Sequence, residues 1–169
     1  MPLEAYLCSR RQPKENNELI VNTPQQTFRA ALGQFFVKET STENLAAARS
    51  LIERSETAGA DLLVLPECII ARKLGMPEWG QKQAEPLDGP FVSGLREATR
   101  GRRVTVVCTV QAKIANESRY ANDLLVIQNG ELRLTYQKIH LYDAFRGKES
   151  RYAAPGDVLP PVLQIGPFK

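Results

Sequence analysis

Hydrophobic and polar positions follow two different periods in the first half of the chain. Apolar residues run through 28–37 and again through 61–66 (DLLVLP), and both stretches have the length of β-strands. Between them, apolar residues recur at helical spacing from Leu45 onward, after a possible capping box at 40–43 and before Gly59. The pattern therefore predicts strand, helix, strand. The unbroken apolar run of 61–66 is typical of a strand that is covered on both faces.

The second half repeats this alternation once and then turns into strands. A loop-like stretch at 76–89 leads to Pro90, which suits the first position of a helix that ends at Gly101. The residues beyond predict strands at 103–110, 124–128, 131–137 and 162–165, a polar turn at 116–120, a hairpin turn at Asn129-Gly130 and an irregular stretch at 138–160. The order β-α-β-α-β-β-β-β predicts the α/β fold class, as a layered domain with a mixed sheet.

The first 27 residues differ from the rest of the chain. They show little periodicity and contain paired arginines, paired asparagines, paired glutamines and three isolated prolines. We interpret 1–27 as a mostly disordered leader, with a short ordered arm packed on the domain as the alternative. The domain itself is then expected to span 28–169.

Composition narrows the class of protein. The chain has 169 residues, of which 43% are apolar and 24% charged, enough to build a core. Its net charge of +3 is too small and too scattered to indicate binding of nucleic acid or of a membrane surface, and no apolar run is long enough to span a bilayer. Three cysteines, Cys8, Cys68 and Cys108, form no paired motif, which favours a reducing, cytoplasmic location.

Three charged residues stand where chemistry could occur. Glu67 directly follows the apolar strand at 61–66, where a partly desolvated carboxylate suits a general base; alternatively it is a solvated strand-end residue. Lys138 ends the hairpin and could stabilise an oxyanion as a fixed point charge, or snorkel to the surface. Glu149 lies in a polar turn and, taken alone, reads as a solvated charge.

A thiol enzyme of another kind is a weaker alternative. His140, the one histidine, could serve as the base for Cys68 or Cys108, but it more often has a structural role so close to a lysine. Alternation places Cys68 away from Glu67, and Cys108 falls in the middle of a predicted strand. Both cysteines therefore also read as small apolar packing residues.

Taken together, four segments resemble the nitrilase, or carbon–nitrogen hydrolase, superfamily. They are AALGQF near Leu32, DLLVLPE ending at Glu67, LLVIQNGELRLTYQKIHLYD through Lys138 and KESRYAAPGD through Glu149. The resemblance covers 28–169, and its details look closest to the deaminated glutathione amidase branch, with omega-amidase-like proteins as neighbours.

The resemblance implies an α-β-β-α sandwich and hydrolysis of a small linear amide by a Glu–Lys–Cys triad, with no cofactor and no metal. It assigns Glu67 as general base, Lys138 as the group that stabilises the tetrahedral intermediate, and Glu149 as the second glutamate, which positions the substrate or the lysine. By the family pattern the nucleophilic cysteine would follow a few residues after Lys169, so the chain alone is expected to be inactive. A homodimer is expected of the full-length parent.

The alternative to a truncated amidase is an inactive remnant or a non-catalytic binding module. In either case, only part of the sandwich would be present. Apolar strand surface should therefore be exposed, and such surface favours association.

Overall fold

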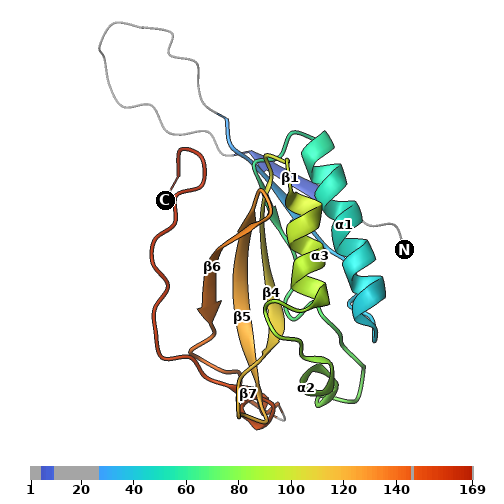
Figure 1. Cartoon of the computed structure of the whole chain (residues 1–169), viewed down its shortest axis with the longest axis vertical. Helices are drawn as coiled ribbons and strands as arrows, with labels where there is room; N and C mark the ends of the chain where they lie inside the picture. The colour runs from blue at the N-terminus through green and yellow to red at the C-terminus, as the bar shows by residue number, and fades with distance from the viewer. Residues whose placement is uncertain (1–4, 10–26, 146, 169) are drawn as a thin grey trace, which may run out of the picture.

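Seven strands form one mixed sheet in the part of the chain that the structure describes, with two long helices on one of its faces (Figure 1). The computed structural model describes residues 5–9, 27–145 and 147–168. The strand order is β1-β2-β3-β4-β5-β6, with β7 beside β5. The strands are β1 (Ala5–Ser9), β2 (Arg29–Gly33), β3 (Leu62–Val64), β4 (Thr105–Lys113), β5 (Tyr120–Gln128), β6 (Glu131–Gln137) and β7 (Ala153–Ala154), and the helices are α1 (Ser41–Thr57), α2 (Trp79–Gln83), α3 (Pro90–Thr99) and the 3-10 turn η1 (Glu149–Arg151).

The ends of α1 confirm the predicted signals. The Thr40 hydroxyl accepts a hydrogen bond from the Glu43 amide at 3.4 Å, which is the N-cap bond of the predicted capping box. The same hydroxyl, rather than the Thr40 backbone amide, donates to the Glu43 carboxylate at 2.7 Å. Gly59 follows the helix with a φ of +68°, a left-handed conformation that glycine adopts without strain. The helix is therefore defined at both ends by its own sequence.

The parallel and antiparallel parts of the sheet follow from the connections. β2, β3 and β4 pair in parallel because α1 and then α3 connect them, whereas β4, β5 and β6 pair antiparallel through short turns. The Asn129-Gly130 turn has positive φ at both residues, as the predicted hairpin requires. The fold class is confirmed as α/β with a mixed sheet.

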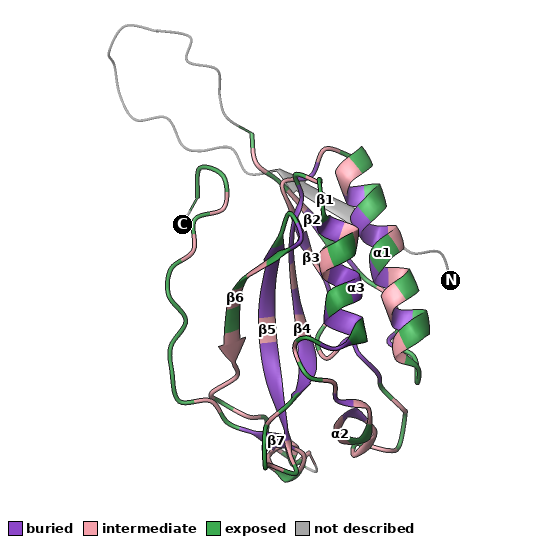
Figure 2. Cartoon of the chain, in the orientation of Figure 1, coloured by how far each residue is buried: buried purple, intermediate pink, exposed green. Residues whose placement is uncertain are grey.

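The core lies between the sheet and the two long helices. Leu51, Leu63, Leu95, Val106 and Leu125 are fully buried there and belong to one apolar cluster. Figure 2 shows β4 and β5 as the strands with the longest buried stretches. This central pair is the rigid base from which the neighbouring loops extend.

Some predicted boundaries are wrong. The predicted strand at 162–165 is not a strand: only an isolated bridge joins Ile165 to Phe168, because no edge of the sheet runs beside this stretch. The strand predicted over 28–37 ends at Gly33, and the predicted loop at 76–89 contains α2. β5 begins at Tyr120, four residues before the prediction, and β7 was missed within the irregular stretch.

The predicted leader contains one strand. Ala5–Ser9 pairs antiparallel with β2, which agrees with the alternative prediction of a short ordered arm. Residues 1–4 and 10–26 lie outside the described residues, so the division at residue 28 stays a prediction.

The sheet face away from the helices carries a continuous apolar row, which we call the open row. It consists of five directly paired residues, one from each of five neighbouring strands. Leu32 is 44% exposed, and Val126, at 5%, is the one buried member of the row. No helix among the described residues covers this face; the stretch after β7 runs along that side of the molecule (Figure 1). The open row consists of Leu32, Val64, Val107, Val126 and Leu134.

We predict that the chain associates through the open row, because sheets bury such faces against a second apolar layer. Leu32→Thr combined with Val107→Thr should shift sedimentation toward the monomer without loss of fold. Leu74→Ser, at a loop position that is 91% exposed, is the matched control and should change nothing. A wild-type chain that remains monomeric at all concentrations in the ultracentrifuge contradicts the prediction.

A second prediction concerns Asp123, which is 6% exposed and has one carboxylate oxygen without a hydrogen-bond partner among the described residues. Burial raises its pKa, so the ionised form destabilises the folded state above that pKa. Asp123→Val should raise the free energy of unfolding at pH 7 by about 1–2 kcal/mol. The gain should fade as the pH falls toward 3.8, the ordinary value.

Urea unfolding at several pH values measures this gain. The control is Asp157→Val at an exposed position. A stabilisation by Asp123→Val that is the same at pH 7 and at pH 3.5 would show that the charge is not its cause.

Candidate active site

Glu67 stands three residues beyond the end of β3, in a loop that is tied to β4. The amides of Leu65 and Ile69 donate to carbonyls of β4, at 2.9 and 3.0 Å. Between them, Cys68 adopts a left-handed conformation with a φ of +54°. Gln111 of β4 holds the far side of the loop, with its amide nitrogen 3.1 Å from the Cys68 carbonyl. The loop therefore turns sharply and leaves the Glu67 side chain 61% exposed at the edge of the sheet.

Lys138 directly follows β6, and its backbone is held on both sides. Its amide donates to the carbonyl of Asn122 in β5, and its carbonyl accepts from the amide of Gly156, both at 2.9 Å. A side chain on Gly156 would place its Cβ 2.5 Å from the Gln137 carbonyl oxygen, so only glycine permits this approach. The lysine thereby keeps a strand-like direction beyond the end of its strand.

Glu149 begins the 3-10 turn η1, and a small loop positions it. Its amide donates to the Tyr142 carbonyl at 3.1 Å, and its carboxylate accepts from the Tyr142 amide at 2.6 Å. The carboxylate of Asp143 accepts from both the amide and the hydroxyl of Ser150. These bonds join Tyr142 and Asp143 to Glu149 and Ser150, and they present the Glu149 carboxylate, which is 15% exposed, to the site.

These three side chains meet at the Lys138 ammonium group. Lys138 Nζ lies 3.2 Å from Glu67 Oε1 and 2.9 Å from Glu149 Oε2. The side-chain amide nitrogen of Asn122 also reaches both carboxylates, at 2.9 Å from Glu67 and 3.2 Å from Glu149. The structure thus brings the three sequence-predicted residues together and adds Asn122.

The charges of the group stabilise one another. Burial opposes the charge of Glu149, but the Tyr142 amide, Lys138 and Asn122 outweigh it and hold the pKa of the carboxyl below its ordinary value. Burial likewise opposes the charge of Lys138, but hydrogen bonds with Glu149 and Glu67 raise its pKa above the ordinary value. The Lys138 ammonium group therefore contacts both carboxylates, and Glu67 is the more exposed of the two, at 61% against 15% for Glu149.

Cys68 and Cys108 do not fit the part of a nucleophile. Burial, together with the charges of Glu67 and Glu149, raises the pKa of Cys68 to about 12 against the opposing effect of Lys138. Cys108 is buried in the core, and burial raises its pKa to about 12 as well. Among the described residues, His140 is exposed and forms no hydrogen bond with either thiol. The alternative of a Cys–His enzyme built from these residues therefore lacks a reactive thiolate.

A cavity of about 430 Å³ opens over the group. Glu67, Lys138 and Glu149 line it, as do Arg72 and Lys148, so that it combines carboxylates with cations. Cys68, Tyr120 and Tyr152 line it too and belong to a small apolar cluster at this end of the molecule. No group of three or more metal-ligating side chains occurs among the described residues.

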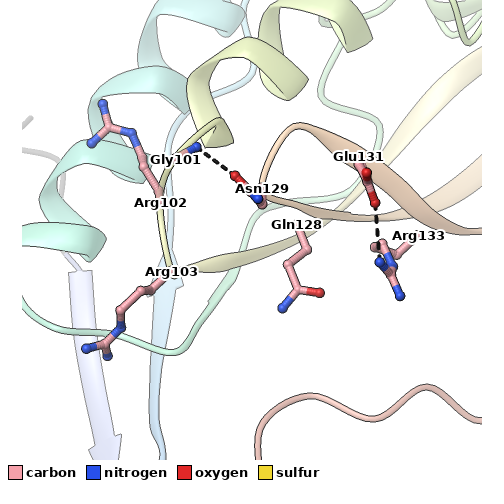
Figure 3. A pocket seen from close by; sticks show the side chains of 7 residues that line it. All are labelled: Gly101, Arg102, Arg103, Gln128, Asn129, Glu131 and Arg133. Carbon is pink, nitrogen blue, oxygen red and sulfur yellow. Dashed lines mark hydrogen bonds and ion pairs between the residues drawn. The ribbon is translucent and has the colours of Figure 1, made fainter.

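A larger hollow of about 520 Å³ lies elsewhere, beside the turn between β5 and β6 (Figure 3). Three arginines line it, but their guanidinium groups point in different directions, and each lies within 4 Å of a carboxylate, at Glu53, Asp61 and Glu131. Its side chains converge on no common point. The smaller cavity is therefore the better candidate, since its charged groups contact one another.

Sequence reasoning missed Asn122 and the loop residues Asp143 and Ser150. Two polar residues, Asn122 and Asp123, interrupt the apolar pattern near the start of β5 and could have indicated a site. The predicted strand began at 124 and therefore left them out. Nothing in the sequence indicates that Asp143 and Ser150 contact each other, because their hydrogen bonds form only in the folded loop.

Comparison with known proteins gives consistent matches. The sequence model of the carbon-nitrogen hydrolase family matches residues 29–168. The deaminated glutathione amidase of Escherichia coli O157:H7 is 32% identical over 139 residues, which are 82% of this chain and 53% of that protein. A hydrolase of Mycobacterium tuberculosis is 36% identical over 132 residues, 76% of this chain and 46% of the relative.

Solved structures share the fold. An amidase from Nesterenkonia sp. AN1, described with acrylamide added to its active-site cysteine, is 26% identical with a TM-score of 0.68, covering 82% of this chain and 54% of that one. The chain thus spans about half the length of the curated relatives it matches. None of the described helices is both long and apolar enough to cross a bilayer.

From the contact between Lys138 and Glu149 we predict that removing the lysine lowers stability, and that the loss depends on pH. Lys138→Met leaves a mostly buried carboxylate without its cation and should lower the free energy of unfolding at pH 7 by about 2 kcal/mol. The pKa of Glu149 should then rise, so the loss is complete above the new pKa and fades as the pH falls below the ordinary value of 4.5.

Chemical denaturation measures this loss, and adding Glu149→Gln should recover most of it. The matched control is Lys113→Met, at the exposed end of β4. A loss that the second substitution does not reduce would mean that the two side chains are not coupled.

Proposed function

Because the chain belongs to the carbon–nitrogen hydrolase family, we propose that it carries the base and the lysine of an amidase that cleaves a small linear amide into an acid and ammonia. The observation that supports this most is the contact of Lys138 with both Glu67 and Glu149 at the mouth of a cavity. The nucleophile in this proposal is a cysteine thiol outside these 169 residues.

The reaction proceeds in two halves. Glu67 accepts the proton of the thiol, the sulfur bonds to the amide carbon, and the carbonyl oxygen becomes an oxyanion beside the Lys138 ammonium. Collapse of this intermediate breaks the C–N bond, and Glu67 returns the proton to the departing ammonia. Glu67 then accepts a proton from water, the water oxygen bonds to the thioester carbon, and the C–S bond breaks to release the acid. Glu67 returns its proton to the departing thiolate, which restores the thiol.

Each group of the site suits its step. Glu67 is the more exposed carboxylate and faces the cavity, so a substrate or thiol can reach it. Glu149 keeps its charge to low pH and holds the lysine in place. Deaminated glutathione is the first substrate to test, because the relative from E. coli is named for it; omega-amides are the second, after the omega-amidase of Xenopus tropicalis, which is 28% identical.

A binding module that holds an amide without cleaving it is the second candidate. The raised pKa of Cys68, the one described cysteine that lines the cavity, favours it for the chain as it stands. The two candidates share the cavity and differ in turnover.

We expect the purified 169-residue chain to release no ammonia from deaminated glutathione or from an omega-amide. If the reading frame continues past Lys169 to a cysteine, the longer product should hydrolyse one of them. In that product, Glu67→Gln should lower kcat by about 10²–10⁴-fold and Lys138→Met by about 10²–10³-fold. Glu131→Gln, at an exposed residue paired with Arg133, is the matched control and should have no effect.

Two results would contradict the proposal. Turnover by the 169-residue chain that both Glu67→Gln and Cys68→Ala abolish would make Cys68 the nucleophile. A longer product that contains a reactive cysteine but releases no ammonia, while it still binds the amide, would favour the binding module.

A further inference from the structure

Asn122 occupies the centre of the site, although no charge marks it in the sequence. It is 2% exposed, and its side-chain nitrogen contacts one oxygen of Glu67 and one of Glu149, at 2.9 and 3.2 Å. Lys138 Nζ contacts these same two oxygens, both at 3.2 Å. Two donors therefore share two acceptors.

The chemistry of the neighbours determines which end of the amide faces them. Ionised carboxylates only accept hydrogen bonds, so the amide nitrogen, which donates two, must point toward Glu67 and Glu149. The position of Asn122 in the middle of the sheet fixes this direction: its backbone carbonyl accepts from the amide of Lys138, at 2.9 Å. The same residue thus anchors the lysine through its backbone and the two carboxylates through its side chain.

The two carboxylates repel each other, and one ammonium group neutralises only one of them. A neutral donor placed between them stabilises both without adding charge. An aspartate in its place would add a third negative charge, and a leucine would remove both hydrogen bonds.

We propose that Asn122 is a positioning residue of the site, which rests on the function proposed above. It holds Glu67 and Glu149 against the Lys138 ammonium group, so that the base and the oxyanion-stabilising group keep one geometry. It touches no reacting atom and acts through the three charged residues.

Two substitutions of similar size test this with opposite signs. In Asn122→Asp, the added carboxylate should raise the pKa of Lys138, so the free amine becomes rarer and acetylation of Lys138 by acetic anhydride at pH 9 slows severalfold. In Asn122→Leu, Glu67 is no longer held against the lysine, the pKa of Lys138 should fall, and acetylation should accelerate. Mass spectrometry measures both rates in the full 169-residue chain, relative to the exposed Lys113.

The matched control is Asn44→Leu. Asn44 is 1% exposed and donates twice from its side-chain nitrogen, both times at 2.9 Å to backbone carbonyls, far along the chain from the charged group. It should lose stability but leave the Lys138 rate unchanged. Equal rates in wild type and in Asn122→Asp, or changes of the same sign in both Asn122 variants, would reduce Asn122 to a packing residue.

If Asn122→Leu does not fold, Asn122→Ala takes its place, because it also removes both hydrogen bonds to the carboxylates and should accelerate the acetylation of Lys138. The labelling reports proton affinity and needs no turnover. A longer product without amidase activity would therefore overturn the proposed function and leave the labelling result standing, whereas unchanged labelling beside normal amidase activity would overturn only this inference.

Discussion

The ammonium group of Lys138, held between two carboxylates, is the interaction on which the rest of the site depends. A lysine that is largely buried needs anions nearby, and Glu149 and Glu67 supply them at 2.9 and 3.2 Å. The carboxylates in turn could not lie so close together without the cation and the amide of Asn122. Because the three charges come from segments up to 82 residues apart in sequence, the site exists only when the sheet is assembled.

The sheet brings these residues together because they lie at the same end of neighbouring strands. β3 and β6 lead directly into the segments that carry Glu67 and Lys138, and β5 between β4 and β6 carries Asn122. The loops beyond the strands are tied back by Gln111, by the Asp143–Ser150 contact and by Gly156. The helices pack on the face of the sheet opposite the open row. One face of the sheet is therefore covered, and the other exposes apolar side chains.

The sequence predicts the elements that carry local signals and misses those that depend on distant partners. The N-cap at Thr40, Gly59 and the Asn129-Gly130 turn depend only on neighbouring residues, and the structure confirms all three. The apolar run at 162–165 looks like a strand but meets no sheet edge, and β7 is a strand only because β5 lies beside it. Alternation alone cannot tell these two cases apart.

The same distinction holds at the site. Glu67, Lys138 and Glu149 could be selected through a family resemblance, and the structure brings them together, while their roles stay proposals. Asn122 could not be selected, because a neutral amide in a strand gains its importance only from the two carboxylates that folding brings to it. The raised pKa of Cys68 was equally hidden, since burial and the two carboxylates act on it only in the folded chain.

The central claim is most directly tested by the exchange of the Lys138 ammonium protons with water, observed by nitrogen-15 NMR of the side-chain amines at neutral pH. An ammonium that donates to two fixed carboxylates should give a protected signal that exchanges far more slowly than that of exposed Lys113, and Glu149→Gln should abolish the protection. A Lys138 signal that exchanges as fast as that of Lys113 in the wild-type chain would contradict the account.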